Sequence, residues 1–211
     1  MGDKRGLLGA LSLRELLTPP RTPADIFSNL PVLQTERLTL RPMSMRDAAD
    51  IYAYSRDPEV ARHVLWDAHQ SLNDSKAYLR YIMKQYRDGT PSSYGMVLNA
   101  TGRLVGTIGF MWYSPENRAA EVGYSLARSL WNNGLMTEAL RAVLEMGFLE
   151  LDLHRIEAQH ETVNPSSGRV MQKCGMKHEG RLRGRVLNKG RYVDVELYAI
   201  LREDWDRLRR P

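Results

Sequence analysis

The periodicity of apolar residues along the chain constrains its fold more than any other feature. Between residues 94 and 126, three runs with strand-like patterns are separated by short turns, whereas the apolar residues from 136 to 148 follow the spacing of one helical face. A strand pattern at 155–162 and a short helix pattern at 165–174 come next. An antiparallel meander that leads into a strand–helix–strand–helix unit predicts a mixed α/β fold.

The flanking segments add elements at both ends of this core. Alternation at residues 36–42 predicts a strand, and two helices are predicted near 45–56 and 73–87, each ending before a proline or a glycine. The last two strands are predicted near 177–186 and 191–200, joined by a short turn that contains glycine. No internal repeat divides the chain.

Length and composition favour one globular domain with an appendage. The chain has 211 residues, of which 43% are apolar and 26% are charged. These values exclude collagen-like, wholly disordered and multi-spanning membrane proteins. In residues 1–30, leucines at helical spacing are followed by three prolines that stop a helix. We expect residues 1–30 to form an appendage that packs on the domain or on a partner, and residues 31–211 to form the domain.

The single cysteine, Cys174, limits which disulfides and metal sites the chain can form and indicates its cellular compartment. It cannot form an intramolecular disulfide, and without a second thiol the cysteine-rich zinc sites are excluded. No stretch reaches 18 uncharged apolar residues, and no cleavage pattern follows the short apolar run at residues 6–13. We therefore predict a cytoplasmic protein without a metal ion or membrane contacts.

The net charge of the chain is positive. Thirty Lys and Arg against 25 Asp and Glu give a formal charge of +5. Such a charge favours anionic partners but does not distinguish a nucleic acid from an anionic cofactor or an acidic protein. In the densest basic stretch, Arg181, Arg183 and Arg185 alternate as one face of a strand does. We interpret them as a solvated face.

One candidate binding loop contains a glycine and precedes the amphipathic helix predicted in the C-terminal half of the chain. Gly134 lies in the segment 130–139, between a strand and an amphipathic helix. The start of a helix presents N–H groups without intrahelical partners, and a glycine lets a phosphate approach the backbone closely. A single glycine is more often a simple entry turn, so this loop alone does not establish a phosphate site.

A second helix start lies at Asn164 and Pro165. Asparagine is a favoured N-cap and proline a favoured first helical residue, so the pair is a complete structural cap. Gly175 suits the left-handed position that follows a helix. None of these features requires catalysis.

Five segments in this order resemble the GNAT acetyltransferase superfamily, and most closely its ribosomal-protein N-acetyltransferase branch (RimJ/RimL-like). The segments are LQTERLTLRP (33–42), AEVGYSL (120–126), WNNGLMTEA (131–139), NPSS (164–167) and DVELY (194–198). The resemblance covers residues 33–205. It implies a mixed, mostly antiparallel, twisted central sheet that is flanked by helices and splayed in the middle for acetyl-CoA.

The resemblance also implies which residues hold acetyl-CoA. Backbone groups of Tyr124, Ser125 and Leu126 are expected to pair with the pantetheine amides as an added strand does. The side chain of Asn164 is expected to turn toward the cofactor arm, beside Ser167. The loop residues whose amides are expected to hold the pyrophosphate are Asn132, Asn133, Gly134, Leu135, Met136 and Thr137.

Two loop residues depart from the family's pattern, Gln/Arg-x-x-Gly-x-Gly/Ala. Trp131 stands where Gln or Arg is usual, and Met136 stands where a second small residue is usual. Trp is common in this branch, but Met is unusual. Because Met136 continues the apolar stripe with Leu140 and Val143, we expect its side chain to point into the core, which leaves the backbone donors free.

Acetyl transfer to an amine needs a base for the amine and an acid for the leaving thiolate. In this branch a glutamate at the position of Glu121 serves as the base, directly or through a water. Many GNAT enzymes place a tyrosine seven residues after the position of Asn164 as the acid, but Met171 fills that position here. The resemblance assigns the acid to Ser167, one helical turn earlier on the same face.

Together these features predict an N-acetyltransferase that uses acetyl-CoA. We expect direct transfer to a primary amine, because Cys174 has a helix-end position typical of packing. The leading acceptor is a protein N-terminus, such as that of a ribosomal protein, so nucleic acid is expected only indirectly through the ribosome. Two alternatives stay open: transfer to a small amine (polyamine, amino acid or aminoglycoside), and a non-catalytic CoA-binding sensor or interaction protein. A homodimer also stays open.

Overall fold

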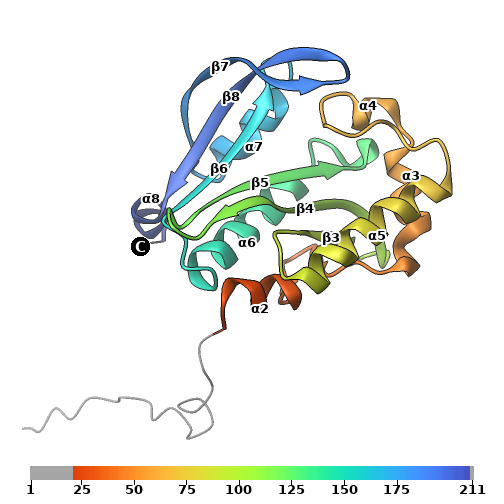
Figure 1. The fold of residues 1–211 in the computed structure, drawn as a ribbon, viewed down its shortest axis with the longest axis horizontal. Coiled ribbons are helices and arrows are strands. Elements are labelled where there is room, and N and C mark those ends of the chain that lie inside the picture. Colours follow the sequence, from red (N-terminus) through yellow and green to blue (C-terminus); the bar gives the residue numbers. More distant parts are fainter. Residues whose placement is uncertain (1–20, 210–211) are drawn as a thin grey trace, which may run out of the picture.

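The computed structural model describes residues 21–209 and contains one mixed sheet between two layers of helices (Figure 1). Its eight strands lie in the order β1-β2-β3-β4-β5-β6-β8-β7, and only β5 and β6 pair in parallel among them. The strands are β1 (Leu33–Gln34), β2 (Leu38–Arg41), β3 (Ser93–Leu98), β4 (Arg103–Ser114), β5 (Ala119–Leu126), β6 (Arg155–Glu161), β7 (Lys177–Asn188) and β8 (Arg191–Leu201).

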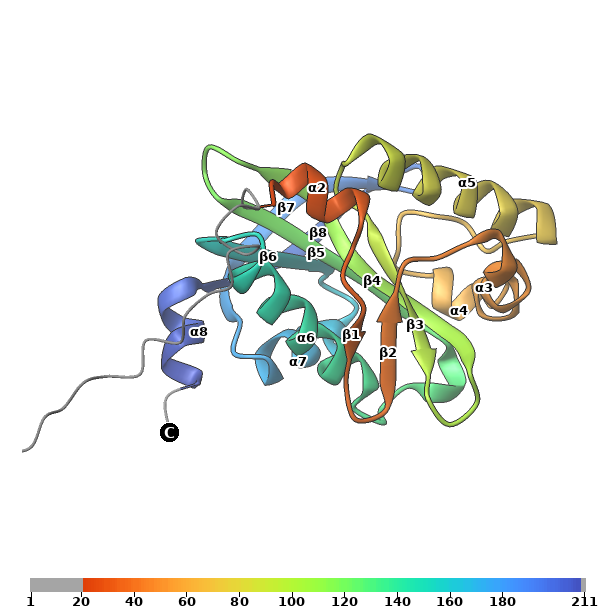
Figure 2. The same cartoon turned by 90° about the horizontal axis from the view of Figure 1, so that it is seen from below.

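The helices cover both faces of the sheet, as Figure 2 shows, with α6 and α7 on one face and α3 and α5 on the other. They are α2 (Pro23–Ser28), α3 (Ala48–Ser55), α4 (Pro58–Ala61), α5 (Leu72–Asp88), α6 (Leu135–Leu149), α7 (Pro165–Lys173) and α8 (Arg202–Leu208), with 3₁₀ turns at Met45–Asp47 and Arg128–Leu130. The predicted meander, the long helix and the short helix after β6 are confirmed. The sequence analysis did not predict α2, α4 or α8.

Each helical layer buries its own apolar cluster against the sheet. The apolar stripe of α6 places Leu140 and Val143 in the larger cluster, where both are fully buried. On the opposite face, Ile51 of α3 packs with Leu79 and Ile82 of α5. Burial of this size stabilises each helix by about 1.5–3 kcal/mol for every large apolar side chain. Both layers are therefore fixed to a common sheet.

Part of the predicted appendage packs on the domain. In α2, a capping box between Thr22 and Asp25 starts the helix, and Ile26 and Phe27 are each 1% exposed. The ring of Phe27 meets that of Phe110 on β4 edge to face, with 6.2 Å between centroids. Residues 1–20 lie outside the described residues, and the domain boundary at residue 30 stays a prediction.

The sheet is splayed between β5 and β6, as predicted. These strands pair over three residues each, Ala119–Glu121 of β5 with 155–157 of β6. Beyond that, β5 follows β4 to Leu126 and β6 follows β8 to Glu161, and the two strands diverge in Figure 1. Backbone polar groups at an open strand edge need partners, so the gap can receive an extended ligand. Within residues 21–209, no helix is long and apolar enough to cross a membrane.

Candidate active site

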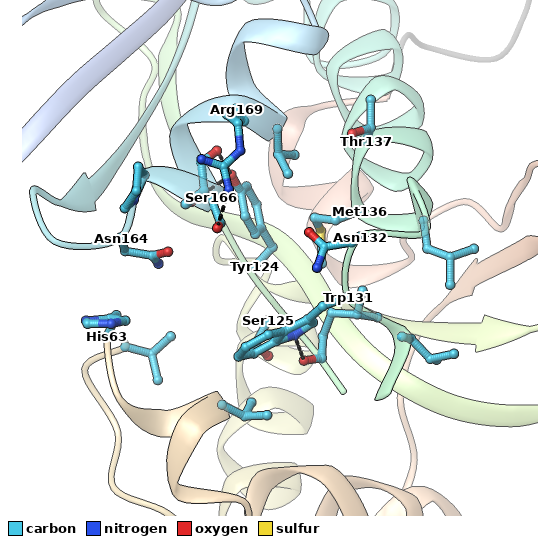
Figure 3. Close-up of a pocket in the computed structure, with 18 of the residues that line it drawn as sticks. His63, Tyr124, Ser125, Trp131, Asn132, Met136, Thr137, Asn164, Ser166 and Arg169 are labelled. Carbon is cyan, nitrogen blue, oxygen red and sulfur yellow. Dashed lines mark hydrogen bonds between the residues drawn. The ribbon is translucent and has the colours of Figure 1, made fainter. Parts of the chain in front are cut away.

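Two cavities meet at the gap between β5 and β6. The first has a volume of about 440 Å³ and lies between the end of β5, the loop before α6 and the start of α7 (Figure 3); we call it the loop cavity. The second, of about 460 Å³, lies between α5, β4, β6 and the β7–β8 hairpin; we call it the aromatic cavity. The junction residues, which line both cavities, are His63, Val64, Tyr124, Ser125, Asn164 and Ser167.

The loop that enters α6 is held in a left-handed conformation. Asn132 has a φ of 62° and Gly134 a φ of 77°, which glycine adopts without steric cost. The Arg37 guanidinium fixes the loop, because it donates to the Asn133 carbonyl at 2.9 Å and pairs with Glu138 of α6 at 2.7 Å. The start of α6, where helical N–H groups lack intrahelical partners, therefore lies in a fixed place beside the loop cavity.

Nearly all of the predicted cofactor residues line the loop cavity. Asn133 does not line it; the side-chain Nδ2 of Asn133 donates to the carbonyl of Trp131 at 3.1 Å. The predicted residues that do line it are Tyr124, Ser125, Leu126, Asn132, Gly134, Leu135, Met136, Thr137, Asn164 and Ser167. The structure thus brings segments from β5, the α6 loop and α7 to one place.

The two residues that depart from the family's loop pattern have separate structural roles. Met136 is 7% exposed and belongs to the larger core cluster, as its place in the apolar stripe predicts. The indole Nε1 of Trp131 donates to the carbonyl of Leu126 at 2.8 Å. Trp131 therefore ties the loop to the end of β5, and the departure at Met136 leaves the backbone of the loop accessible.

Asn164 and Ser167 face the junction from the first turn of α7. Asn164 is the N-cap of α7 and Pro165 its first residue, as predicted, but the side chain of Asn164 makes no capping hydrogen bond. Figure 3 shows its amide at the edge of the loop cavity. The Ser167 hydroxyl lies 2.9 Å from the hydroxyl of Tyr124, which also donates to the Ser167 carbonyl at 3.1 Å. Met171, one turn further along α7, is 1% exposed.

Glu121 lies on β5 at the last residue that pairs with β6, and it lines the aromatic cavity. One of its oxygens accepts a hydrogen bond from Trp112 Nε1 at 2.7 Å, and the other accepts from Gln159 Nε2 at 3.0 Å. Burial raises the pKa of Glu121, and these two hydrogen bonds offset only part of that effect. A carboxylate whose pKa is raised in a cavity suits proton abstraction better than a solvated glutamate does.

A second polar network, which the sequence analysis missed, borders the junction. Nδ1 of His63 lies 2.8 Å from one oxygen of Glu161, and Asn188 Nδ2 donates to the other at 2.6 Å. These residues come from the segment after α4, the end of β6 and the end of β7. His63 and Glu161 are 98 positions apart in the chain, so no local motif could have linked them.

The thiol of Cys174 lines neither cavity. It is 6% exposed at the end of α7, and burial raises its pKa to about 11. The thiolate is therefore scarce at neutral pH. In the part of the chain that the structure describes, no cluster of three or more His, Cys, Asp or Glu side chains could hold a metal ion.

Comparisons with known proteins agree on the family. The model of the acetyltransferase (GNAT) domain matches residues 37–177, which is more than half of the chain. An uncharacterized N-acetyltransferase, p20, from Bacillus licheniformis is 32% identical over 173 residues, covering 82% of this chain and 97% of the relative. The [Ribosomal protein uS5]-alanine N-acetyltransferase of Escherichia coli is 29% identical over 191 residues, covering 84% of this chain and 95% of the relative.

Solved structures agree as well. The crystal structure of a GNAT-family acetyltransferase from Bacillus anthracis has a TM-score of 0.74 and 29% sequence identity, and the match covers 82% of this chain and 99% of that one. The arrangement of one splayed sheet between helices is thus shared over nearly the whole length of that neighbour.

Proposed function

The chain belongs to the GNAT acetyltransferase family, and on that premise we propose that it transfers the acetyl group of acetyl-CoA directly to the primary amine of a protein N-terminus. One observation carries the proposal: the loop cavity and the aromatic cavity meet at the gap between β5 and β6. A thioester that reaches the gap from the loop cavity would meet an amine that enters from the aromatic cavity.

The loop cavity fits the chemistry of acetyl-CoA, the acetyl donor of GNAT enzymes. The open edge of β5 at Tyr124–Leu126 can pair with an extended arm that carries amides. The N–H groups after Gly134 suit the pyrophosphate, and Arg169 and Lys173 of α7 add positive charge to the lining. Acetyl-CoA bound there supplies an acetyl group that is already activated as a thioester.

The proposed chemistry uses one carboxylate and one pair of hydroxyls. Glu121 accepts a proton from the incoming amine, which can then attack the thioester. Ser167 gives a proton to the leaving sulfur from the N-terminal turn of α7, where the helix dipole also favours negative charge. The neighbouring hydroxyl of Tyr124 can return a proton to Ser167, because their oxygens are 2.9 Å apart. We propose direct transfer, since the buried thiol of Cys174 cannot serve as an intermediate carrier.

Two observations support a protein N-terminus as the acceptor. The name of the Escherichia coli relative gives an alanine of ribosomal protein uS5 as its substrate. The aromatic cavity is lined by Trp66, Tyr78 and Phe110 as well as by Glu121, so it offers an apolar surface for a small side chain next to a carboxylate for the amine. We expect a cytoplasmic enzyme, and a homodimer stays a prediction.

A panel of acceptors tests this proposal. Purified protein is incubated with acetyl-CoA and either N-terminal peptides, including those of ribosomal proteins, or polyamines, amino acids and aminoglycosides, and the release of CoA thiol is followed. We expect turnover with peptides. Turnover with small amines alone would replace the acceptor, and tight binding of acetyl-CoA without any turnover would make the protein a CoA-binding module.

A further inference from the structure

The junction residues include one side chain, that of His63, whose functional group can act as a base. The other five junction residues offer no such base. Val64 is apolar, Asn164 carries an amide, and hydroxyl groups are found on Tyr124, Ser125 and Ser167. His63 differs, because a neutral imidazole has one ring nitrogen with a lone pair that can accept a proton. Glu121 lines the aromatic cavity but not the loop cavity, so it lies on the acceptor side of the point where the two cavities meet.

The hydrogen bond of His63 fixes which nitrogen is free. A carboxylate accepts hydrogen bonds and does not donate them, so Nδ1 of His63 carries the hydrogen that points to Glu161 at 2.8 Å. In the neutral ring, Nε2 then holds a lone pair. Within residues 21–209, Nε2 has no hydrogen-bond partner, and Figure 3 shows the ring at the edge of the loop cavity, on the same side as Asn164.

Glu161 is built to hold the histidine in this form. It is 5% exposed, and its other oxygen accepts a hydrogen bond from Asn188 at 2.6 Å. Burial alone would raise the pKa of Glu161, but the hydrogen bonds from His63 and Asn188 outweigh burial and lower it. The carboxylate therefore stays ionised and accepts the hydrogen of His63 Nδ1. Charged groups also surround the pair: Glu59 and Arg62 at α4, Arg169 on α7, Arg191 on β8, and Lys189 in the β7–β8 turn, whose Nζ donates to the carbonyl of Ala61.

The reaction itself calls for a second base. An amine that arrives as an ammonium ion loses two protons from nitrogen on its way to an amide. Only one proton is needed on sulfur when the C–N bond has formed and the C–S bond breaks. The other proton leaves to solvent. Glu121 accounts for the first proton, which departs before the attack.

We propose that His63, oriented by Glu161, is a catalytic base that takes the second proton, through Nε2, from the nitrogen of the newly formed adduct. This inference rests on the proposed function. In the full sequence Glu121 and His63 each accept one proton and later return it to solvent. Ser167 gives one proton to sulfur and regains one from Tyr124, which in turn takes a proton from water. One proton is released per acetyl group transferred, as the overall reaction requires.

The first test reads the tautomer without any substrate. ¹⁵N NMR of the histidine rings in the ligand-free protein, at a pH where His63 is neutral, is expected to show its proton on Nδ1 and a lone pair on Nε2. A neutral His63 with its proton on Nε2 could not accept a second one there, and the proposal would be overturned. This measurement needs no substitution, so it decides the question even if a variant of His63 fails to fold.

The second test is kinetic. His63→Ala is expected to lower kcat by about 10²-fold, at the low end of the range for a lost general base because Glu121 remains, with the affinity for acetyl-CoA unchanged by calorimetry. Added imidazole should raise the rate of this variant in proportion to its concentration. The matched control is His154→Ala, an exposed histidine away from both cavities, whose rate should neither fall nor respond to imidazole.

Two kinetic results would overturn the role of His63: an undiminished kcat in His63→Ala, or a loss of rate that imidazole does not relieve. Failure of the proposed function looks different. In that case the unmodified protein would itself show no acetyl transfer to the N-terminal peptides of the panel, whatever the tautomer of His63.

Discussion

Among single residues, Glu121 carries the most weight in the proposed chemistry. Glu121→Gln keeps the shape of the side chain and one accepting oxygen, but it replaces the other oxygen with an NH₂ group that only donates, and so removes the base. We expect kcat to fall by about 10² to 10⁴, the range for a lost general base, with little change in acetyl-CoA affinity. The matched control is Glu116→Gln on the exposed β4–β5 turn, which should retain its rate. Near-normal turnover of Glu121→Gln would remove Glu121 from the mechanism.

The environment of Glu121 also predicts a pH profile. A base works only when it is ionised, and burial raises the pKa of Glu121 above the 4.5 of an ordinary glutamate. As the pH is lowered, kcat should therefore fall with a midpoint above pH 4.5. Trp112→Phe removes a hydrogen bond that lowers the pKa, so it should move the fall to higher pH. Glu157→Gln removes a negative charge that raises the pKa, so it should move the fall to lower pH. Identical profiles for the three proteins would contradict this assignment.

The hydroxyls of Ser167 and Tyr124 form a pair whose members can be separated by a double-mutant cycle. Ser167→Ala should lower kcat by about 10- to 10³-fold, with the lower end applying where water substitutes as the acid. Tyr124→Phe should have a smaller effect, because Ser167 remains. The double variant should be little slower than Ser167→Ala alone, since Tyr124 acts through Ser167. Fully additive losses would mean that the two hydroxyls act independently.

At the scale of elements, Gly134 and Arg37 together fix the conformation of the loop before α6. Gly134→Val would strain a backbone at φ 77° and place a branched side chain where a phosphate must approach. Loss of one charge-assisted hydrogen bond, about 1.5–3 kcal/mol, corresponds to an acetyl-CoA affinity about 10- to 100-fold lower. Calorimetry measures this change.

A matched variant separates backbone strain from the loss of the phosphate site. Gly102 lies in the β3–β4 turn at φ 67°, and a Cβ there would meet nothing within 4 Å. Gly102→Val should therefore cost similar folding stability but leave acetyl-CoA affinity unchanged. Equal affinity in folded Gly134→Val and Gly102→Val would mean that the pyrophosphate is held elsewhere.

The elements that the sequence predicted are those with a clear local period. The strands of the meander and the apolar stripe of α6 follow from spacing alone, because their residues face a core on one side. Short α4 has only four residues, Pro58–Ala61, too few to show a helical period. Local periodicity also could not predict how residues 21–30 pack on the domain. That packing depends on the contact between Phe27 and Phe110, which are far apart in the chain.

For the whole molecule, the site arises from long-range contacts that no motif encodes. The resemblance pointed to Glu121, Ser167 and the α6 loop, because each lies in a recognisable segment. It could not point to His63, whose partner Glu161 is 98 positions away and whose place at the junction depends on how α4 packs over the sheet. Arg37 was seen only as part of a strand motif, although it holds the loop through Asn133 and Glu138.

The central claim is that acetyl-CoA occupies the gap between β5 and β6, and amide hydrogen exchange with and without the ligand tests it directly. We predict slower exchange at residues 124–126 and 134–137, where the ligand should accept hydrogen bonds from the backbone, and unchanged exchange at the β3–β4 turn around Gly102. Binding of acetyl-CoA that leaves the exchange of both segments unaltered would contradict the account.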